Sequence, residues 1–292
     1  MSLKLVAIDL DGTLLSPEKQ ISKENIQSIW KAQNQGHIVM ICSGRAPEDI
    51  KQIIQKYGLT CPIAGSNGSV VEVDSRIIKN VSMDLEDVVY TAQQLDDAKI
   101  PYYLYTNQGI FAPDNWPNRV VELTRNIEDL PDDFKRIAEK LEQSKLIKYF
   151  THYNDVLIKD NLKVNKIFIL TFNTQRKKGI ASSLSQVSNI IITSSGPYNI
   201  EIMHKTGHKG NGLKSMADYY NIPLANTVAI GDNFNDIPML EMAGLSIAME
   251  NADYQVKNIC DCITLSNSKH GVSYALDIYI LSFLFSMLKI HR

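Results

Sequence analysis

The feature that most constrains the fold is an alternation of short apolar runs with helix-forming runs, which stops and later resumes. The apolar runs typical of buried strands are residues 3–10, 37–42, 227–231 and 245–248. The runs with helical spacing are residues 22–35, 47–57, 210–220 and 237–243. Such alternation is typical of βαβ units around a parallel sheet. We therefore predict one α/β core built from both ends of the chain.

The middle of the chain follows another pattern. Amphipathic segments such as residues 85–98 alternate there with strand-like runs such as residues 102–106 and 166–172. A chain of 292 residues is long enough for two domains. The predicted fold is thus a Rossmann-like parallel-sheet core, residues 1–83 and 205–292, with an inserted α+β cap domain, residues 84–204.

Charge and composition exclude several kinds of partner. The chain has 30 Lys+Arg against 32 Asp+Glu, so no net positive field attracts nucleic acid or an anionic membrane. A small-molecule partner is therefore predicted. Asp9 and Asp11 interrupt the apolar residues near the N-terminus, which therefore do not resemble a secretory signal, and this predicts a cytoplasmic protein.

The apolar C-terminal run, residues 279–288, has two interpretations. It is apolar nearly all round, but a membrane-spanning helix needs about twenty residues. A helix packed on the core is the first interpretation. The second is a surface for self-association, because the run has no polar face.

The cysteines and histidines do not predict a zinc site. His204 and His208 have the spacing of a helical metal pair, but Thr206-Gly207 between them opposes a helix. The cysteines have neither paired metal-site spacing nor the density of a disulfide scaffold, so reduced thiols are predicted. They are Cys42, Cys61, Cys260 and Cys262.

Two acidic motifs come directly after apolar runs. They are Asp9-Leu10-Asp11-Gly12-Thr13 and Gly231-Asp232-Asn233-Phe234-Asn235-Asp236. Ligands of parallel α/β sheets bind at the carboxyl ends of strands, so the carboxylates of both motifs are expected to meet there. Carboxylates at close range raise one another's pKa, and their joint ionisation needs a cation. Oxygen ligands without His or Cys favour Mg²⁺.

Three further features accompany the acidic motifs. Ser43-Gly44-Arg45 follows the run 37–42, and its hydroxyl and backbone N–H groups suit phosphate oxygens, although ordinary turns use the same residues. Lys209 begins a helix pattern, where it either faces a ligand at the helix N-terminus or lies in solvent. Asn67-Gly68 suits a hairpin turn, with a substrate contact as the alternative.

Taken in order, these features resemble the four motifs of the haloacid dehalogenase-like hydrolases. The motifs are Asp9 to Thr13, Ser43-Gly44-Arg45, Lys209 and Gly231 to Asp236. The long segment before Lys209, with Ser195-Gly196-Pro197 and Glu201-Ile202-Met203, resembles the Cof-type branch of that family, which carries a large α/β cap.

The resemblance implies a role for each motif residue. Asp9 would be the nucleophile that forms an aspartyl-phosphate, and Asp11 the general acid and base. Mg²⁺ would be held by Asp9, the backbone carbonyl of Asp11 and Asp232. Phosphate-binding positions would be Leu10, Ser43, Gly44, Lys209 and Asn235. Secondary positions near the metal or the substrate would be Asp236, Arg45 and Asn67.

The function implied is a Mg²⁺-dependent phosphatase of small phosphorylated metabolites, such as sugar phosphates. A phosphomutase would use the same groups and return the phosphoryl group to its substrate. A regulator that binds a phosphometabolite without turnover is a third hypothesis, which the intact Asp9 and Asp11 pair disfavours. Residues 106–109 are predicted to form a hairpin turn or to contact the leaving group.

Overall fold

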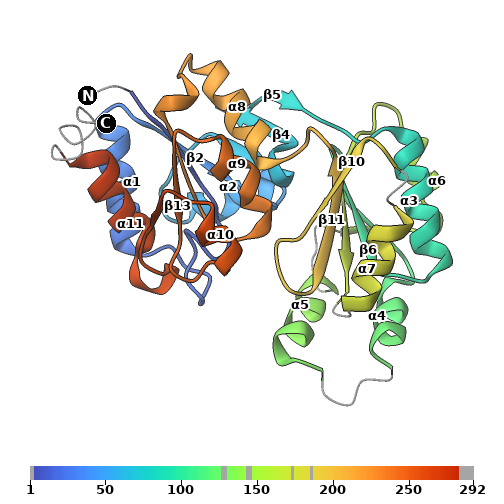
Figure 1. The fold of residues 1–292 in the computed structure, drawn as a ribbon. Helices are drawn as coiled ribbons and strands as arrows, with labels where there is room; N and C mark the ends of the chain where they lie inside the picture. The colour runs from blue at the N-terminus through green and yellow to red at the C-terminus, as the bar shows by residue number, and fades with distance from the viewer. Residues whose placement is uncertain (1–2, 126–129, 143–146, 172–173, 185–186, 283–292) are drawn as a thin grey trace. The chain divides into compact units, whose positions relative to one another are not determined.

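The structure is a computed structural model that describes residues 3–125, 130–142, 147–171, 174–184 and 187–282. The chain forms two compact units (Figure 1). The first contains Met1–Asn80 and Thr206–Arg292, and the second contains Val81–Lys205. The predicted α/β class with a parallel-sheet core is confirmed.

The first unit is built on an eight-stranded sheet of order β14-β13-β12-β1-β2-β3-β4-β5 among the described residues. Its strands are β1 (Leu5–Ile8), β2 (Ile38–Cys42), β3 (Ile63–Gly65), β4 (Val70–Val73), β5 (Arg76–Asn80), β12 (Thr227–Gly231), β13 (Leu245–Ala248) and β14 (Cys262–Ile263). Strands β14 to β3 run parallel.

Strands β4 and β5 run antiparallel, which the alternation of strands and helices did not predict. The physical reason lies in the connections. β3 is joined to β4 by the short helical turn η1 (Ser66–Gly68), and β4 to β5 by a turn of two residues. Parallel neighbours need a crossover of a dozen or more residues, so these short turns force antiparallel pairing.

Strand β1 occupies the middle of this sheet. Ile8 pairs with Ile230 of β12 on one side and with Ile41 of β2 on the other. All residues of β1 and β12 are buried, as are nearly all of β2, because helices cover both faces of a parallel sheet. Burial on both faces explains why these strands are continuous apolar runs.

The helices of the first unit are α1 (Lys23–Asn34), α2 (Pro47–Gln55), α8 (Lys209–Tyr219), α9 (Ile237–Met242), α10 (Tyr254–Asn258) and α11 (Gly271–Leu276). Four of them, α1, α2, α8 and α9, begin and end close to the predicted positions, and α10 and α11 were not predicted. Ser22 caps α1 as predicted, since its hydroxyl accepts a hydrogen bond from the N–H of Asn25. α1 packs against α11 (Figure 1), and the Asn25 side chain accepts from the N–H of Ser273 at 2.9 Å.

The second unit has a six-stranded sheet of order β10-β11-β9-β6-β7-β8 among the described residues. Its strands are β6 (Tyr102–Thr106), β7 (Gly109–Pro113), β8 (Ile147–Phe150), β9 (Val164–Leu170), β10 (Ile190–Thr193) and β11 (Asn199–His204). Its helices are α3 (Leu85–Asp97), α4 (Trp116–Thr124), α5 (Asp132–Glu142), α6 (Asn154–Leu157) and α7 (Thr174–Ser183). All strand pairs are antiparallel except β7 with β8.

Residues 106–109 form the hairpin turn between β6 and β7. The Asn107 side chain accepts from the N–H of Lys163 and donates to the carbonyl of Asn161. The Gln108 side chain donates to the carbonyl of Asp160. These contacts hold the hairpin within its own unit and support the turn interpretation.

The chain after α11 continues as a π-helical turn, Asp277–Leu281, in which Ile280 is buried. The rest of the apolar C-terminal run, from residue 283, lies outside the described residues. Among the described residues, no helix is both long and apolar enough to cross a bilayer. All four cysteines are free thiols; Cys42 and Cys61 are buried, and the other two are half-buried.

Candidate active site

The two acidic motifs meet at the carboxyl end of the central strands. Asp9 follows β1 directly, and its N–H donates to the carbonyl of Ile230 in β12 at 3.0 Å. Asp232 follows β12 directly. Because β1 and β12 are parallel neighbours, their exits lie at the same sheet edge. The register thus brings together two carboxylates that are far apart in the sequence.

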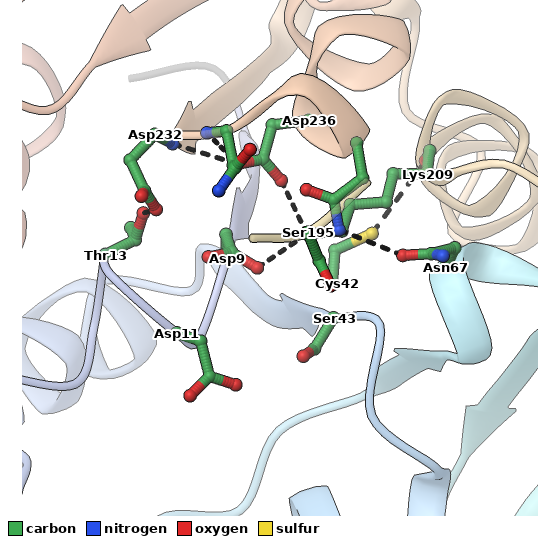
Figure 2. A network of polar contacts seen from close by, with 12 residues as sticks. Asp9, Asp11, Thr13, Cys42, Ser43, Asn67, Ser195, Lys209, Asp232 and Asp236 are labelled. Atoms are coloured by element: carbon green, nitrogen blue, oxygen red, sulfur yellow. Dashed lines mark hydrogen bonds and ion pairs between the residues drawn. The ribbon is translucent and has the colours of Figure 1, made fainter. Parts of the chain in front are cut away.

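Three carboxylates converge at this edge (Figure 2). Asp9, Asp232 and Asp236 each offer an oxygen, and these oxygens lie within 4.8 Å of one another. Thr13 orients Asp232, because its hydroxyl donates to Oδ1 of Asp232 at 2.7 Å. The donor set contains only carboxylate oxygens, which suits a hard divalent cation.

Gly12 lets the first motif approach the second. Its φ is +84°, and a Cβ at this position would lie 2.3 Å from Oδ2 of Asp232. An L-residue would therefore meet both an unfavourable backbone conformation and a clash. The glycine of the motif is needed for the close approach between the two acidic loops.

Lys209 lies inside the acidic cluster. It is the first residue of α8 and is fully buried. Its Nζ donates to Oδ1 of Asp9 and to Oδ1 of Asp236, both at 2.5 Å. Burial alone would lower the pKa of Lys209, but the charges of Asp236 and Asp9 raise it well above its ordinary value. The ammonium is a permanent charge at this site, and the solvent-exposed alternative is wrong.

Burial and the charge of Asp236 raise the pKa of Asp9 and Asp232. The pKa of Asp9 is raised by burial and then by the charge of Asp236, against the opposing charge of Lys209. The pKa of Asp232 is raised to about 7 by burial and then by Asp236. Full ionisation of both at neutral pH therefore needs more positive charge than one lysine supplies.

Asp236 organises the loop that carries Asp232. The loop enters the short turn η3 (Phe234–Asp236), and Oδ2 of Asp236 accepts from the N–H groups of Asp232 and Asn233, both at 2.9 Å. Its other oxygen accepts from Lys209. Asp236 therefore connects the ammonium group to the backbone of the late acidic loop.

Asp11 has different partners from the other three carboxylates. Arg45 donates to it through Nε at 2.6 Å and through Nη2 at 2.9 Å, and Lys19 donates at 3.0 Å. Arg45 also donates to Asp49 at 2.7 Å. Figure 2 shows the Asp11 carboxylate turned away from those of Asp232 and Asp236. The expectation that all carboxylates of both motifs converge is therefore wrong for the side chain of Asp11.

The cations around Asp11 determine its ionisation. Burial raises its pKa, but the hydrogen bonds and charge of Arg45, and then the charge of Lys19, hold that pKa well below its usual range. Asp11 is consequently ionised in this conformation. The carboxyl must leave these partners before it can carry a proton.

Apart from Lys209, the phosphate-binding positions predicted from the resemblance lie on the loops that follow the central strands. Ser43 follows β2 and is buried, and its hydroxyl accepts from the N–H of Arg45 at 3.3 Å. Gly44 follows in the same loop, and Leu10 lies buried between the two aspartates of the first motif. Asn235 donates from its side-chain amide to Oδ1 of Asn67 at 3.0 Å.

Several contacts of the site were missed by the sequence analysis. Thr13 was assigned no role of its own, although it belongs to the first motif and orients Asp232. Lys19 and Asp49 carried no signal, because they follow neither a strand nor a motif. His208 caps α8 through its side chain, which accepts from the N–H of Asn211.

A buried acidic cluster with one lysine, at the carboxyl edge of a parallel α/β sheet, is an arrangement suited to phosphoryl transfer. The family model of the haloacid dehalogenase-like hydrolases matches residues 6–276. The chain belongs to this family.

Two relatives with similar sequences are named as phosphatases. The phosphatase YwpJ of Bacillus subtilis is 30% identical over 94% of this chain and 99% of its own length. The 5-amino-6-(5-phospho-D-ribitylamino)uracil phosphatase YwtE of the same organism is 34% identical over 94% of this chain and 97% of its own. The chain is accordingly a phosphoric monoester hydrolase.

Solved structures show the same fold. A haloacid dehalogenase-like hydrolase from B. subtilis superposes with a TM-score of 0.84 at 30% identity, covering 95% of this chain and all of the other. The sugar phosphatase BT4131 superposes with a TM-score of 0.78 at 22% identity, covering 94% of this chain and 98% of the other. The second likeness concerns the fold alone.

Proposed function

We propose that this chain is a Mg²⁺-dependent phosphatase that hydrolyses small phosphorylated metabolites through an aspartyl-phosphate on Asp9. The observation that carries the proposal is the position of Asp9, whose carboxylate lies between the ammonium of Lys209 and the carboxylate of Asp232. A carboxylate nucleophile needs positive charge nearby if it is to approach an anionic phosphate ester, and Lys209 supplies one such charge.

Mg²⁺ fits the acidic cluster. Asp9 and Asp232 would hold it, together with the backbone carbonyl of Asp11, and Asp236 would lie close by. When bound, the cation neutralises charge on the phosphoryl oxygens and on the carboxylates. The raised pKa values of Asp9 and Asp232 support this assignment, because the site without a cation has an excess of negative charge.

The chain's own residues supply the covalent steps. An oxygen of Asp9 attacks phosphorus while the bond to the leaving oxygen breaks, and the carboxyl of Asp11 donates its proton to that oxygen. Water then attacks phosphorus, Asp11 takes the proton of the water, and the bond to Asp9 breaks to release phosphate. Lys209, Ser43 and Asn235 hold phosphoryl oxygens, with the Gly44 amide and Leu10 in the same role.

The pairing of Asp11 with Arg45 suits one of these steps better than the other. The ionised carboxylate is ready to accept a proton from water. For the first step Asp11 must be protonated, so its carboxyl has to leave Arg45 and Lys19 before the leaving oxygen departs. The proposal therefore includes a movement of the Asp11 side chain between the two steps.

The substrate is a small phosphate ester, and we assign its selection to the unit Val81–Lys205. Three relatives, YwtE, YitU and YcsE, are named for 5-amino-6-(5-phospho-D-ribitylamino)uracil. A phosphorylated ribitylaminopyrimidine therefore belongs beside sugar phosphates and nucleotides in a screen of released phosphate. If the enzyme hydrolysed none of the compounds in such a panel, that result would contradict the proposed function.

The variant Asp9→Asn tests the nucleophile. Asparagine keeps the shape of the side chain but not its negative charge, so turnover should fall to background while the fold is retained. Asp218→Asn is the matched control, because Asp218 is an exposed residue of α8 paired with Lys214, and it should keep wild-type activity. Full activity in Asp9→Asn would refute the assignment.

The same assay separates the alternatives. A phosphomutase would return the phosphoryl group to the substrate and release little free phosphate. A regulator without catalysis would bind phosphate esters at the same residues and release none. Stoichiometric release of phosphate and dephosphorylated product is the result that the phosphatase proposal predicts.

A further inference from the structure

The turn η1, residues 66–68, contacts three segments of the candidate site. It joins β3 to β4, and its residues are Ser66, Asn67 and Gly68. Their φ angles are +49°, +58° and +83°, so all three have left-handed backbone. Residues other than glycine adopt this conformation rarely, and it persists where surrounding contacts enforce it, often at functional sites.

The backbone of the turn is bound to the loop after β2. The N–H of Ser66 donates to the carbonyl of Arg45 at 2.7 Å, and the N–H of Asn67 donates to the carbonyl of Ser43 at 2.9 Å. Ser43 is a proposed phosphate-binding residue. The position of the turn and the position of that loop are therefore coupled.

The turn is also packed closely against the start of α8. A Cβ on Gly68 would lie 2.7 Å from the carbonyl oxygen of His208, the residue before Lys209. A Cβ on Gly212 would lie 3.0 Å from Cα of Gly68. Backbone meets backbone here, so the turn has no room to move toward the helix that carries Lys209.

The Asn67 side chain reaches the late acidic loop. Its Oδ1 accepts the hydrogen bond from Nδ2 of Asn235, and both residues are buried. A side-chain amide has two N–H donors in one plane. Engaging one of them with a fixed acceptor fixes the direction of the other.

We propose that Asn67 is a positioning residue that orients the amide of Asn235 for a phosphoryl oxygen. This inference rests on the proposed function, which assigns that oxygen to Asn235. The turn is held by the Ser43 loop and by α8, so Asn67 provides an acceptor at a constant place between them. Asn67 thereby aligns the donor of the late acidic loop with those of the Ser43 loop and Lys209.

The choice of asparagine follows from three requirements at this position. The backbone is left-handed, which asparagine and glycine tolerate better than other residues. Glycine would keep the backbone but lose the acceptor. Aspartate would keep the acceptor but place another negative charge near the anionic substrate. Asparagine satisfies all three requirements.

The test compares kcat and KM for hydrolysis of para-nitrophenyl phosphate. Asn67→Gly tolerates the left-handed backbone and removes the side chain that carries the acceptor, so kcat should fall about 10-fold to 100-fold with a smaller change in KM. Asn67→Ala should lose at least as much. The control is Asn221→Gly, because Asn221 has φ +53° and is exposed beyond the far end of α8. The control should keep wild-type kcat.

A double-variant cycle separates positioning from a general loss of structure. In the Asn235→Ala background, adding Asn67→Gly should lower kcat little further, because the amide it positions has already been removed. If the fold-losses of kcat in the two single variants multiplied in the double variant, the proposal would be overturned. Wild-type kcat in Asn67→Gly would also overturn it. An unchanged midpoint of thermal unfolding in Asn67→Gly shows that the fold is intact.

The outcomes also separate this proposal from the proposed function. If the wild type releases no phosphate, both fail. If the wild type is active and Asn67→Gly is equally active, only the positioning role fails. Reduced activity in Asn67→Gly with no further loss in the double variant supports both.

Discussion

Replacing Lys209 by methionine removes the charge from the centre of the acidic cluster and keeps most of the side-chain volume. Lys209 is fully buried and is paired with both Asp9 and Asp236. Removing one partner of a buried ion pair costs about 3–5 kcal/mol, because the remaining charge is left uncompensated. Lys209 compensates two carboxylates, so we expect the upper part of that range, about 4–5 kcal/mol.

Thermal unfolding measures this loss. In a unit of this size each kcal/mol corresponds to about 2–4 °C, so Tm should fall by roughly 8–20 °C in chelator at about pH 8. Mg²⁺ should restore part of the Tm that Lys209→Met loses, because the cation then neutralises the carboxylates in place of the lysine. Lys214→Met is the control, since the exposed Lys214–Asp218 pair on the same helix should contribute at most about 1 kcal/mol. Equal stability of Lys209→Met and the wild type in chelator would refute the reasoning.

Two further predictions concern the same edge of the sheet. Gly12→Ala places a Cβ against Asp232, so kcat should fall about 100-fold. Gly36→Ala has a similar φ of +88° with free space around its Cβ and should lose only stability; equal activity of the two variants would contradict this reasoning. Burial and then Asp236 raise the pKa of Asp232 to about 7, and a carboxyl with a raised folded-state pKa destabilises the fold as pH rises. Burial lowers the pKa values of His37 and His208, so these two groups stabilise the fold as pH rises, and they do so equally with and without the cation. The stabilisation by Mg²⁺, read as the difference between melts with cation and with chelator, should therefore grow from about pH 4 to about pH 7; a stabilisation that shrinks over this range would contradict the metal assignment.

The sequence predicts the part of the site that depends on strand order. Asp9 and Asp232 each follow a run of buried residues, and parallel neighbours place their exits at one edge. Both runs are largely apolar, as central strands covered on both faces are, and the structure shows that they are neighbours. The predicted helix and strand ranges of the core agree with the structure for the same reason.

Side-chain directions beyond the strands could not be predicted in this way. The direction of Asp11 depends on the left-handed turn at Gly12 and on Arg45 and Lys19, which come from other loops. The burial of Lys209 depends on the packing of α8 against the turn at residues 66–68. These contacts join residues far apart in the sequence, and no local periodicity records them.

The antiparallel edge formed by β4 and β5 shows a second limit. The alternation of strands with helices predicts parallel pairing, but no helix separates β3, β4 and β5. Asn67-Gly68 carried the signal of a hairpin turn, and antiparallel pairing of β3 with β4 follows from it. The contact of that same turn with Asn235 was visible only in the fold.

The most direct test of the account is chemical trapping of the covalent intermediate. The enzyme is mixed with Mg²⁺ and a substrate that it hydrolyses, and the reaction is quenched during turnover. The quenched enzyme is then treated with borohydride, which reduces an acyl phosphate to an alcohol. Peptide mass spectrometry should then find homoserine in place of Asp9, and the same treatment of Asp9→Asn should give none. Active enzyme that shows no homoserine at position 9, or shows it at another aspartate, would contradict Asp9 as the nucleophile.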